Sequence, residues 1–158
     1  MDTPESNHVN TEMDPEQLAA KVRNSAVGSL ARREHSYYEL REKLLHKFND
    51  AKCVDAALEW VSELGYLDDA RFAGMFVRSS VSKGRGPERI TRELQQKGVA
   101  AHIVEDALAE CDVNWLTLAE EVLRRKFPVP AQEYKDKAKQ MRYLQYRGFT
   151  MSQIYELV

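Results

Sequence analysis

The chain has 158 residues, of which 43% are apolar and 30% charged, and its formal net charge is −2. This composition is typical of a folded chain the size of one domain or a few small repeats, and it excludes an intrinsically disordered protein. Only seven glycines and five prolines occur, and no apolar run approaches the roughly 20 residues that cross a bilayer, so a turn-rich all-β fold and a membrane-spanning protein are also excluded.

The charge is unevenly distributed along the chain. Residues 1–16 hold five acids and no Lys or Arg, whereas the remainder carries 23 − 20 = +3. Within that remainder, residues 71–97 hold seven Lys/Arg against two acids, residues 98–123 hold six acids alone, and residues 124–147 hold eight Lys/Arg against two acids. Such blocks are either basic stripes for an anionic partner or solvated helix faces. Because residues 1–13 lack an apolar core, we expect a disordered acidic leader there and not a signal peptide.

Residues 14–67 predict a first group of three helices. Asp14 can cap the first helix, and Ser36 with Glu39 forms the Ser-x-x-Glu capping box of the second. The third helix stops at Gly65, a residue that suits the left-handed position after a helix.

Two further groups of three helices follow. In residues 68–111 the second helix starts at Pro87, because proline is favoured at the first helical position. In residues 112–158 we expect Asp112 to cap the first helix, and a second helix to cover residues 137–147.

An internal repeat emerges when the chain is shifted by 50 residues. The shift superposes a leucine, then a basic residue and, in two copies, a glycine: Leu44, Leu94 and Leu144; Lys47, Lys97 and Arg147; Gly98 and Gly148, with Phe48 in the first copy. A basic side chain in the last turn interacts favourably with the helix dipole, and a glycine commonly ends a helix. Independent selection for these packing needs is therefore one explanation of the match. A true repeat is the other, and it predicts an all-α fold of three tandem three-helix, helix-turn-helix-like repeats in an elongated, curved array.

No pattern for catalysis, metal binding or cofactor binding is present. The four histidines are scattered, and no Cys-x-x-Cys or His-Glu-x-x-His occurs. Cys53 and Cys111 lie in apolar helical patterns, so we expect buried small residues, no disulfide and a reducing cytoplasm. We therefore predict a protein that is not an enzyme and has no metal, cofactor or catalytic residue.

Long ordered motifs in the middle of the chain resemble the RecX family of bacterial recombination regulators, a likeness that covers about residues 18–158. The motifs are Gly65-Tyr66-Leu67-Asp68-Asp69-x-Arg71-Phe72-Ala73, then Lys83-Gly84-x-Gly86-Pro87-x-Arg89-Ile90-x-x-Glu93-Leu94-x-x-Lys97-Gly98-Val99, and at the end Leu144-x-Tyr146-Arg147-Gly148-Phe149. The resemblance implies an all-helical array of three-helix repeats. It also implies binding to the RecA recombinase and its filament on single-stranded DNA, with inhibition of the ATPase, strand-exchange and coprotease activities, and so a role in recombination, DNA repair and the SOS response.

Basic residues without an obvious packing need are the candidates for contact with RecA or DNA. They are Arg71, Lys83, Arg85, Arg89, Lys97, Arg142 and Arg147. Arg71 and Arg89 could instead hold the fold through pairs with Asp68, Asp69 or Glu93. Reversing the charge of Arg85 and Arg89 is expected to weaken inhibition and leave the fold intact.

Two other functions stay open from the sequence. One is a helical-repeat nucleic-acid-binding protein that acts directly on single- or double-stranded DNA, marked by salt-dependent binding to naked DNA. The other is an interaction scaffold for a different partner. A monomer is favoured, because helices at both ends of the array can cap it.

Overall fold

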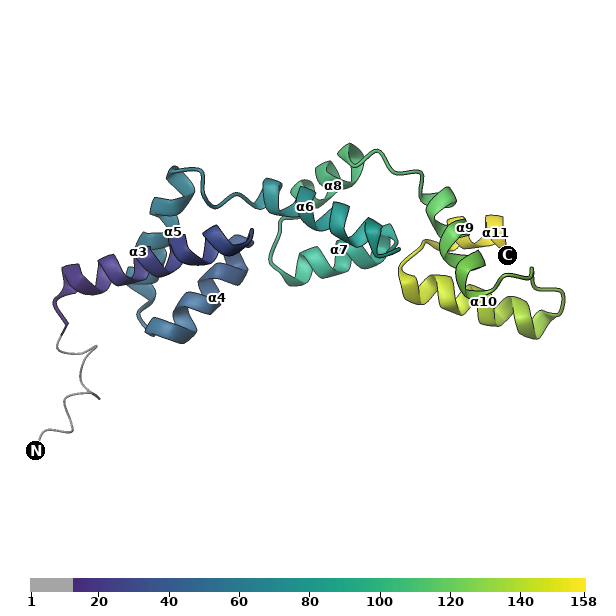
Figure 1. Cartoon of the computed structure of the whole chain (residues 1–158), viewed down its shortest axis with the longest axis horizontal. Helices are drawn as coiled ribbons and strands as arrows, with labels where there is room; N and C mark the ends of the chain where they lie inside the picture. Colours follow the sequence, from purple (N-terminus) through teal and green to yellow (C-terminus); the bar gives the residue numbers. More distant parts are fainter. Residues whose placement is uncertain (1–12) are drawn as a thin grey trace, which may run out of the picture. The chain divides into compact units, whose positions relative to one another are not determined.

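The computed structural model describes residues 13–158, and this part of the chain forms nine α-helices and contains no strand (Figure 1). The predicted all-α repeat fold is thus confirmed. The described residues divide into two compact units, one that ends at residue 69 and one that covers residues 70–158. All but the last residue of the expected leader lies outside the described residues.

The first unit contains helices α3 (Pro15–Arg32), α4 (Tyr37–Phe48) and α5 (Ala51–Glu63), which contact one another in all three pairs. We call them triad 1. Helix α5 buries one face whose residues recur every three or four positions, the spacing that places side chains on one side of a helix: Val54, Ala57, Leu58 and Val61. They join Leu40 and Leu44 of α4 in one apolar core.

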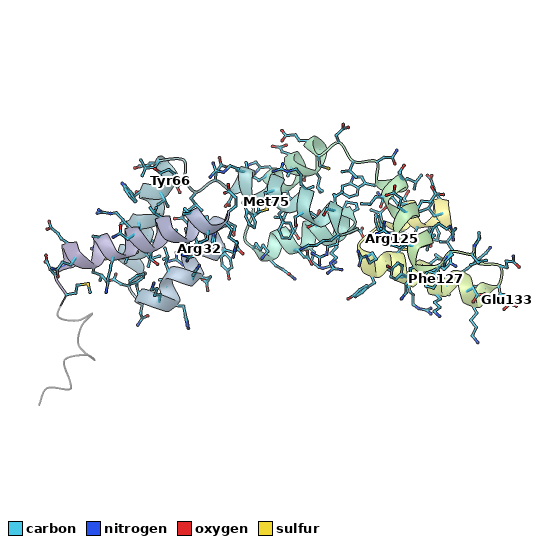
Figure 2. The ribbon with its side chains drawn as sticks, viewed as in Figure 1. Arg32, Tyr66, Met75, Arg125, Phe127 and Glu133 are labelled. Carbon is cyan, nitrogen blue, oxygen red and sulfur yellow. The ribbon has the colours of Figure 1, made fainter. Side chains whose placement is uncertain are left out.

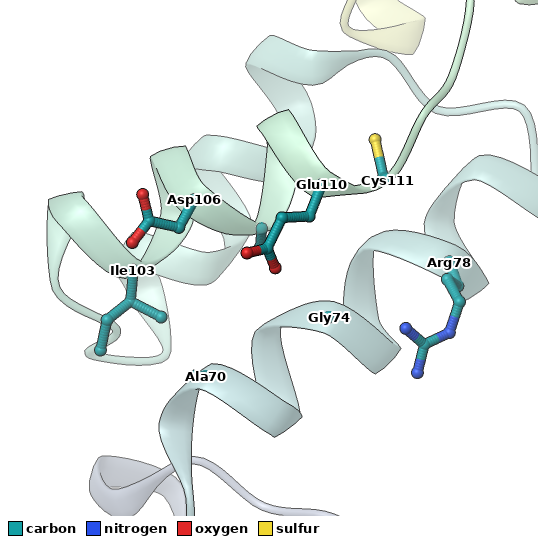
Figure 3. Close-up of a pocket in the computed structure, with 8 residues that line it drawn as sticks. Ala70, Gly74, Arg78, Ile103, Asp106, Glu110 and Cys111 are labelled. Carbon is teal, nitrogen blue, oxygen red and sulfur yellow. The ribbon is translucent and has the colours of Figure 1, made fainter.

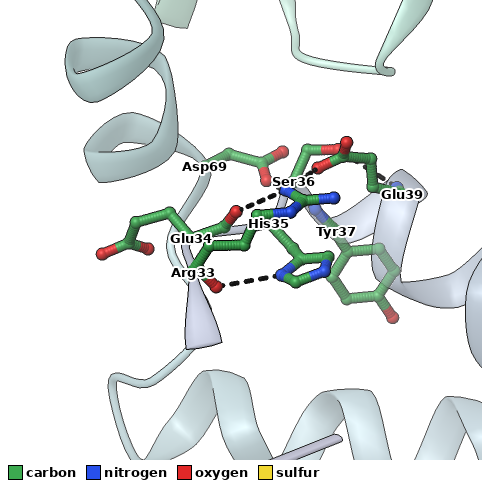
Figure 4. A network of polar contacts seen from close by, with 7 residues as sticks. All are labelled: Arg33, Glu34, His35, Ser36, Tyr37, Glu39 and Asp69. Atoms are coloured by element: carbon green, nitrogen blue, oxygen red, sulfur yellow. Dashed lines mark hydrogen bonds and ion pairs between the residues drawn. The ribbon is translucent and has the colours of Figure 1, made fainter. Parts of the chain in front are cut away.

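The start of α4 is held by side chains of its own unit (Figure 4). The Ser36 hydroxyl accepts a hydrogen bond from the Glu39 N–H, and the Glu39 carboxylate accepts one from the Ser36 N–H, both at 3.1 Å. The predicted capping box is therefore confirmed. The N–H of Tyr37 donates to the carboxylate of Asp69 at 2.8 Å, which satisfies another free donor of the first turn.

A buried histidine lies beside this capping box. His35 is only 2% exposed, and its Nδ1 lies 3.0 Å from the carbonyl oxygen of Arg33. Its Nε2 is buried and has no hydrogen-bond partner. Burial lowers the pKa of His35, because the charged imidazolium loses its hydration. Burial likewise raises the pKa of the Asp69 carboxyl.

Triad 2 consists of α6 (Asp69–Ser82), α7 (Pro87–Gln96) and α8 (Ala101–Glu110). As predicted, α7 begins at a proline. Its core contains four residues of the central motifs, Phe72, Ile90, Leu94 and Val99.

Triad 3 consists of α9 (Trp115–Lys126), α10 (Tyr134–Arg147) and α11 (Met151–Leu157). Two expectations here were wrong. Asp112 does not cap α9; it adopts φ +53° in the turn, and Asn114 accepts the capping hydrogen bond from the Thr117 N–H at 3.0 Å. Helix α10 also starts at Tyr134, three residues before the predicted residue 137.

The helix ends explain why the repeat lacks a glycine in triad 1. Gly65, Gly98 and Gly148 all adopt positive φ at a helix end, as predicted. In triad 1 the helix runs through Phe48 and ends one residue later at Asn49, with φ +50°. Asparagine tolerates this left-handed conformation better than other non-glycine residues, so it takes the place of the glycine.

Candidate functional site

Two backbone hydrogen bonds join triad 2 to triad 3 inside the second unit. The Gly86 N–H donates to the carbonyl of Arg147 at 2.8 Å, and the Glu88 N–H donates to the carbonyl of Gly148 at 2.9 Å. Gly86 is the N-cap of α7, where no side chain caps the helix. Carbonyl groups of triad 3 therefore satisfy donors that a helix start leaves free. We call this contact, between residues 83–89 and 147–149, the junction.

At two positions of the junction the backbones of the two triads approach so closely that no side chain fits between them. A Cβ atom on Gly86 would lie 2.4 Å from the carbonyl carbon of Gly148. A Cβ on Gly148 would lie 2.3 Å from the Cβ of Arg89, and Gly148 also has φ +101°. Glycine at both positions is thus a requirement of the backbone contact.

Arg147 anchors the junction from α10. Its Nε donates to the carbonyl oxygen of Gly84 at 3.3 Å, and an Nη donates to the carbonyl oxygen of Lys83. The loop between α6 and α7 is thereby fixed by a side chain from the next triad. Arg147 is a structural residue as well as a candidate contact.

Arg85 and Arg89 converge on one carboxylate. Arg89 Nε lies 3.0 Å from Glu93, one turn further along α7, and Arg85 lies 3.9 Å from the same side chain. The guanidinium of Arg89 also lies 5.7 Å from the centre of the exposed Tyr146 ring on α10. Arg89 thus pairs with Glu93 within the fold, which was the structural alternative to a partner contact. A charge-reversed Arg85 and Arg89 pair would therefore disturb the junction as well as any partner contact, so it is a poor probe of binding.

The structure brings four of the seven candidates together and leaves three apart. Lys83, Arg85, Arg89 and Arg147 meet at the junction. Arg71 is exposed near the opposite end of α6 from residue 83. Lys97 is half-buried, with its Nζ 5.8 Å from the Phe76 ring centre. Arg142 is exposed on α10, five residues before Arg147 and thus about 140° around the helix from it.

Two of the residues beside the junction, Arg125 and Lys126, were missed as candidates from the sequence. Arg125 and Lys126 of α9 and Tyr143 of α10 line a hollow together with the candidates Lys83 and Arg147 (Arg125 is labelled in Figure 2). The run Arg124-Arg125-Lys126 in the last turn of α9 was the available signal, but it also suits the helix dipole and so did not point to a site.

A second hollow, of about 260 Å³, lies between α6 and α8 (Figure 3). Arg78 faces it from α6, and Asp106 and Glu110 face it from α8. The thiol of Cys111 donates to the carbonyl of Leu108 at 3.0 Å. Charges of both signs line this hollow, so it attracts a single class of charged ligand less than the hollow beside the junction, whose charged residues are all basic.

The described residues offer no place for a metal or a membrane span. Across residues 13–158, no three His, Cys, Asp or Glu side chains are grouped so that they could hold a metal ion. No helix in that range is long and apolar enough to cross a bilayer. Cys53 and Cys111 are both free thiols. Both were expected to be buried, but they are half-buried.

The chain matches known proteins over most of its length. Residues 68–108 match the second three-helix domain of RecX, and residues 112–158 match the third. The chain is 44% identical over 141 residues to regulatory protein RecX of Vibrio vulnificus (strain CMCP6), covering 89% of this chain and 91% of that protein. It is 41% identical over 150 residues to regulatory protein RecX of Escherichia coli (strain K12), covering 87% and 90%.

Solved structures share the fold. A crystal structure of RecX from Lactobacillus salivarius aligns with a TM-score of 0.72 at 24% identity, covering 89% of this chain and 94% of that one. A crystal structure of regulatory protein RecX aligns with a TM-score of 0.77 at 21% identity, covering 99% and 79%. With relatives above 40% identity along nearly their whole length, this chain belongs to the RecX family of regulatory proteins.

Proposed function

We propose that this protein is a cytoplasmic, monomeric regulator that binds the RecA recombinase and its filament on single-stranded DNA. It inhibits the ATPase, strand-exchange and coprotease activities of RecA and thereby modulates recombination, DNA repair and the SOS response. The observation that carries this proposal is the identity of 41–44% to regulatory proteins RecX across about nine-tenths of the chain. No catalytic step is required of the protein itself.

The junction supports the proposal by holding basic groups in fixed positions. Backbone hydrogen bonds at 2.8 and 2.9 Å fix the loop that bears Lys83 and the turn that bears Arg147. Groups held in place lose less conformational entropy when a partner binds. A partner surface with acidic residues, or a bound DNA strand, would complement them.

Several repeats in one chain allow several linked contacts. We propose that the repeats comprise residues 14–67, 68–111 and 112–158, and that more than one of them contacts the filament. Linked weak contacts raise the effective concentration of the next contact, with gains of about 10²–10⁴ in overall affinity. Binding that bridges protomers in one geometry stabilises that filament state over the state that hydrolyses ATP.

The test is single-strand-DNA-dependent ATP hydrolysis by RecA of the same bacterium, with this protein titrated from well below one copy per RecA. We expect the rate to fall at substoichiometric ratios. The variant Lys83→Glu/Arg142→Glu changes two exposed candidates that have no ion pair within residues 13–158, and it should raise the half-inhibiting concentration about tenfold.

A matched control reverses two exposed lysines in the first turn of α10, Lys135→Glu/Lys137→Glu. It should inhibit almost as well as the parent protein. An unchanged ATPase rate at several-fold excess of folded parent protein would contradict the proposed function.

The alternative, a protein that acts directly on DNA, is favoured by one observation. The hollow beside the junction is lined by basic residues and a tyrosine, which is the chemistry that suits a nucleic-acid strand.

A further inference from the structure

We propose that the hollow beside the junction binds a backbone phosphate of single-stranded nucleic acid. Its walls come from the α6–α7 loop, α9 and α10, and it is lined by Lys83, Gly84, Val122, Arg125, Lys126, Tyr143 and Arg147. We call it the phosphate groove. This inference goes beyond RecA binding and does not depend on it, because it concerns naked nucleic acid.

The charge of the groove is uncompensated. Four of the seven lining residues are basic and none is acidic. Within residues 13–158, none of the four has a carboxylate within ion-pair distance. Arg85 and Arg89 nearby differ, since both lie within ion-pair distance of Glu93, which offsets part of their charge. Four cations that converge without a counter-charge attract an anion from solution.

One cation of the groove is already oriented. Arg147 commits two of its five N–H donors to the carbonyls of Lys83 and Gly84, which leaves three donors for a ligand. The fit is close, because a Cβ on Gly84 would lie 2.9 Å from an Arg147 nitrogen and 2.9 Å from a Val122 methyl. A planar guanidinium held in this way matches the oxygens of a phosphate.

An aromatic ring lies in the same wall. The Tyr143 ring packs edge-on against Phe127 at 5.6 Å between ring centres, and Lys126 Nζ lies 5.9 Å from the Tyr143 ring centre. One turn further along α10, Tyr146 is 72% exposed. Tyr143 is half-buried, so Tyr146, next to the lining residue Arg147 in the chain, is the ring that can stack an unpaired base, which favours a single strand over a duplex whose bases are already paired.

The composition of the lining favours a phosphate over an acidic protein surface. Lysine is depleted in the centres of protein interfaces, whereas two of the four cations here are lysines. The hollow has a volume of about 280 Å³, which leaves room for a phosphate group.

The experiment is fluorescence anisotropy of the full chain with a labelled oligothymidylate of about 30 nucleotides and no RecA, between about 50 and 200 mM salt. The variant Lys83→Gln/Arg125→Gln removes two exposed cations of the groove. We expect binding about tenfold weaker at the lowest salt. The slope of log affinity against log salt should fall by about 0.7, since the groove holds one phosphate and each single-strand phosphate contact contributes about 0.7.

A matched control removes one arginine and one lysine from the same unit but outside the groove, Arg92→Gln/Lys135→Gln. It should bind within about twofold of the parent. Thermal unfolding must show both variants folded.

Three results would overturn the proposal: equal affinity of parent and groove variant, an equal loss in groove and control variants, or groove-dependent binding of polyglutamate without binding of the oligonucleotide. Because RecA is absent, each result is independent of whether the protein inhibits RecA.

Discussion

Helices α4 and α7 occupy equivalent places in the repeat, 50 residues apart, yet their first turns are satisfied in different ways. The start of α4 uses side chains of its own unit, Ser36 and Glu39 in a capping box and the Asp69 carboxylate on the Tyr37 N–H. The start of α7 has no side-chain cap at Gly86, and carbonyls of Arg147 and Gly148 in triad 3 accept its hydrogen bonds instead.

This difference shows how one repeated element serves two purposes. The capping box satisfies the start of α4 with residues of its own first turn, and a single further contact comes from Asp69 at the start of α6. The start of α7, in contrast, forms its hydrogen bonds only when triad 3 is folded against it. Triads 2 and 3 are therefore expected to unfold together, and the basic residues at the junction keep their positions only while that contact exists.

The largest effect is expected for Gly148→Ala. The substitution combines a left-handed φ of +101° with a Cβ placed 2.3 Å from that of Arg89, so we expect a loss of about 3–4 kcal/mol in the free energy of unfolding. Gly65→Ala is the matched control. Gly65 has φ +81° but nothing within 4 Å of its Cβ position, so only the backbone cost of about 1 kcal/mol applies. Urea unfolding of both variants measures the difference, and equal losses would contradict the close packing of the junction.

A somewhat smaller effect is expected for Gly86→Ala. The Cβ would lie 2.4 Å from the Gly148 carbonyl carbon and force the two triads apart, at about 2–3 kcal/mol. Ser36→Ala also places alanine at the equivalent N-cap of α4, but there it only removes a local capping hydroxyl, at about 1 kcal/mol. If Ser36→Ala costs as much as Gly86→Ala in urea unfolding, the contrast between the two helix starts is wrong.

The smallest effect expected is a pH dependence of the free energy of unfolding, caused by His35 in triad 1. The pKa of His35 is lowered in the folded protein, so below its ordinary value near 6.5 the unfolded chain binds a proton that the folded chain does not. Stability should therefore fall as the pH drops from about 7.5 to 5.5. Urea unfolding at both pH values checks this, and His35→Gln should flatten the dependence. A variant that keeps the full pH dependence would exclude His35 as its cause.

Local features of the fold could be predicted from the sequence because their causes are local. The capping box at Ser36, the proline start of α7 and the helix-ending glycines depend on residues within one turn of each other. The buried residues of the central motif, such as Ile90 and Leu94, follow from helical spacing.

The junction could not be predicted, because it joins residues far apart in the chain. Arg147 contacts the carbonyls of Lys83 and Gly84 across 63 or 64 positions, and no spacing rule connects a side chain with a backbone carbonyl at that separation. The error at Asp112 has a different cause. Both Asp112 and Asn114 are good capping residues, and the turn geometry decided between them.

The most direct test of the central claim, that this RecX-family protein acts on RecA filaments, is binding to preassembled filaments of RecA from the same bacterium on single-stranded DNA. The filaments are immobilised through the DNA and compared with bare RecA-free strands at physiological salt. The account predicts saturable binding to filaments that is tighter than binding to the bare strand, with less than one copy bound per RecA. No binding to filaments above that to bare DNA, with the protein shown to be folded, would contradict it.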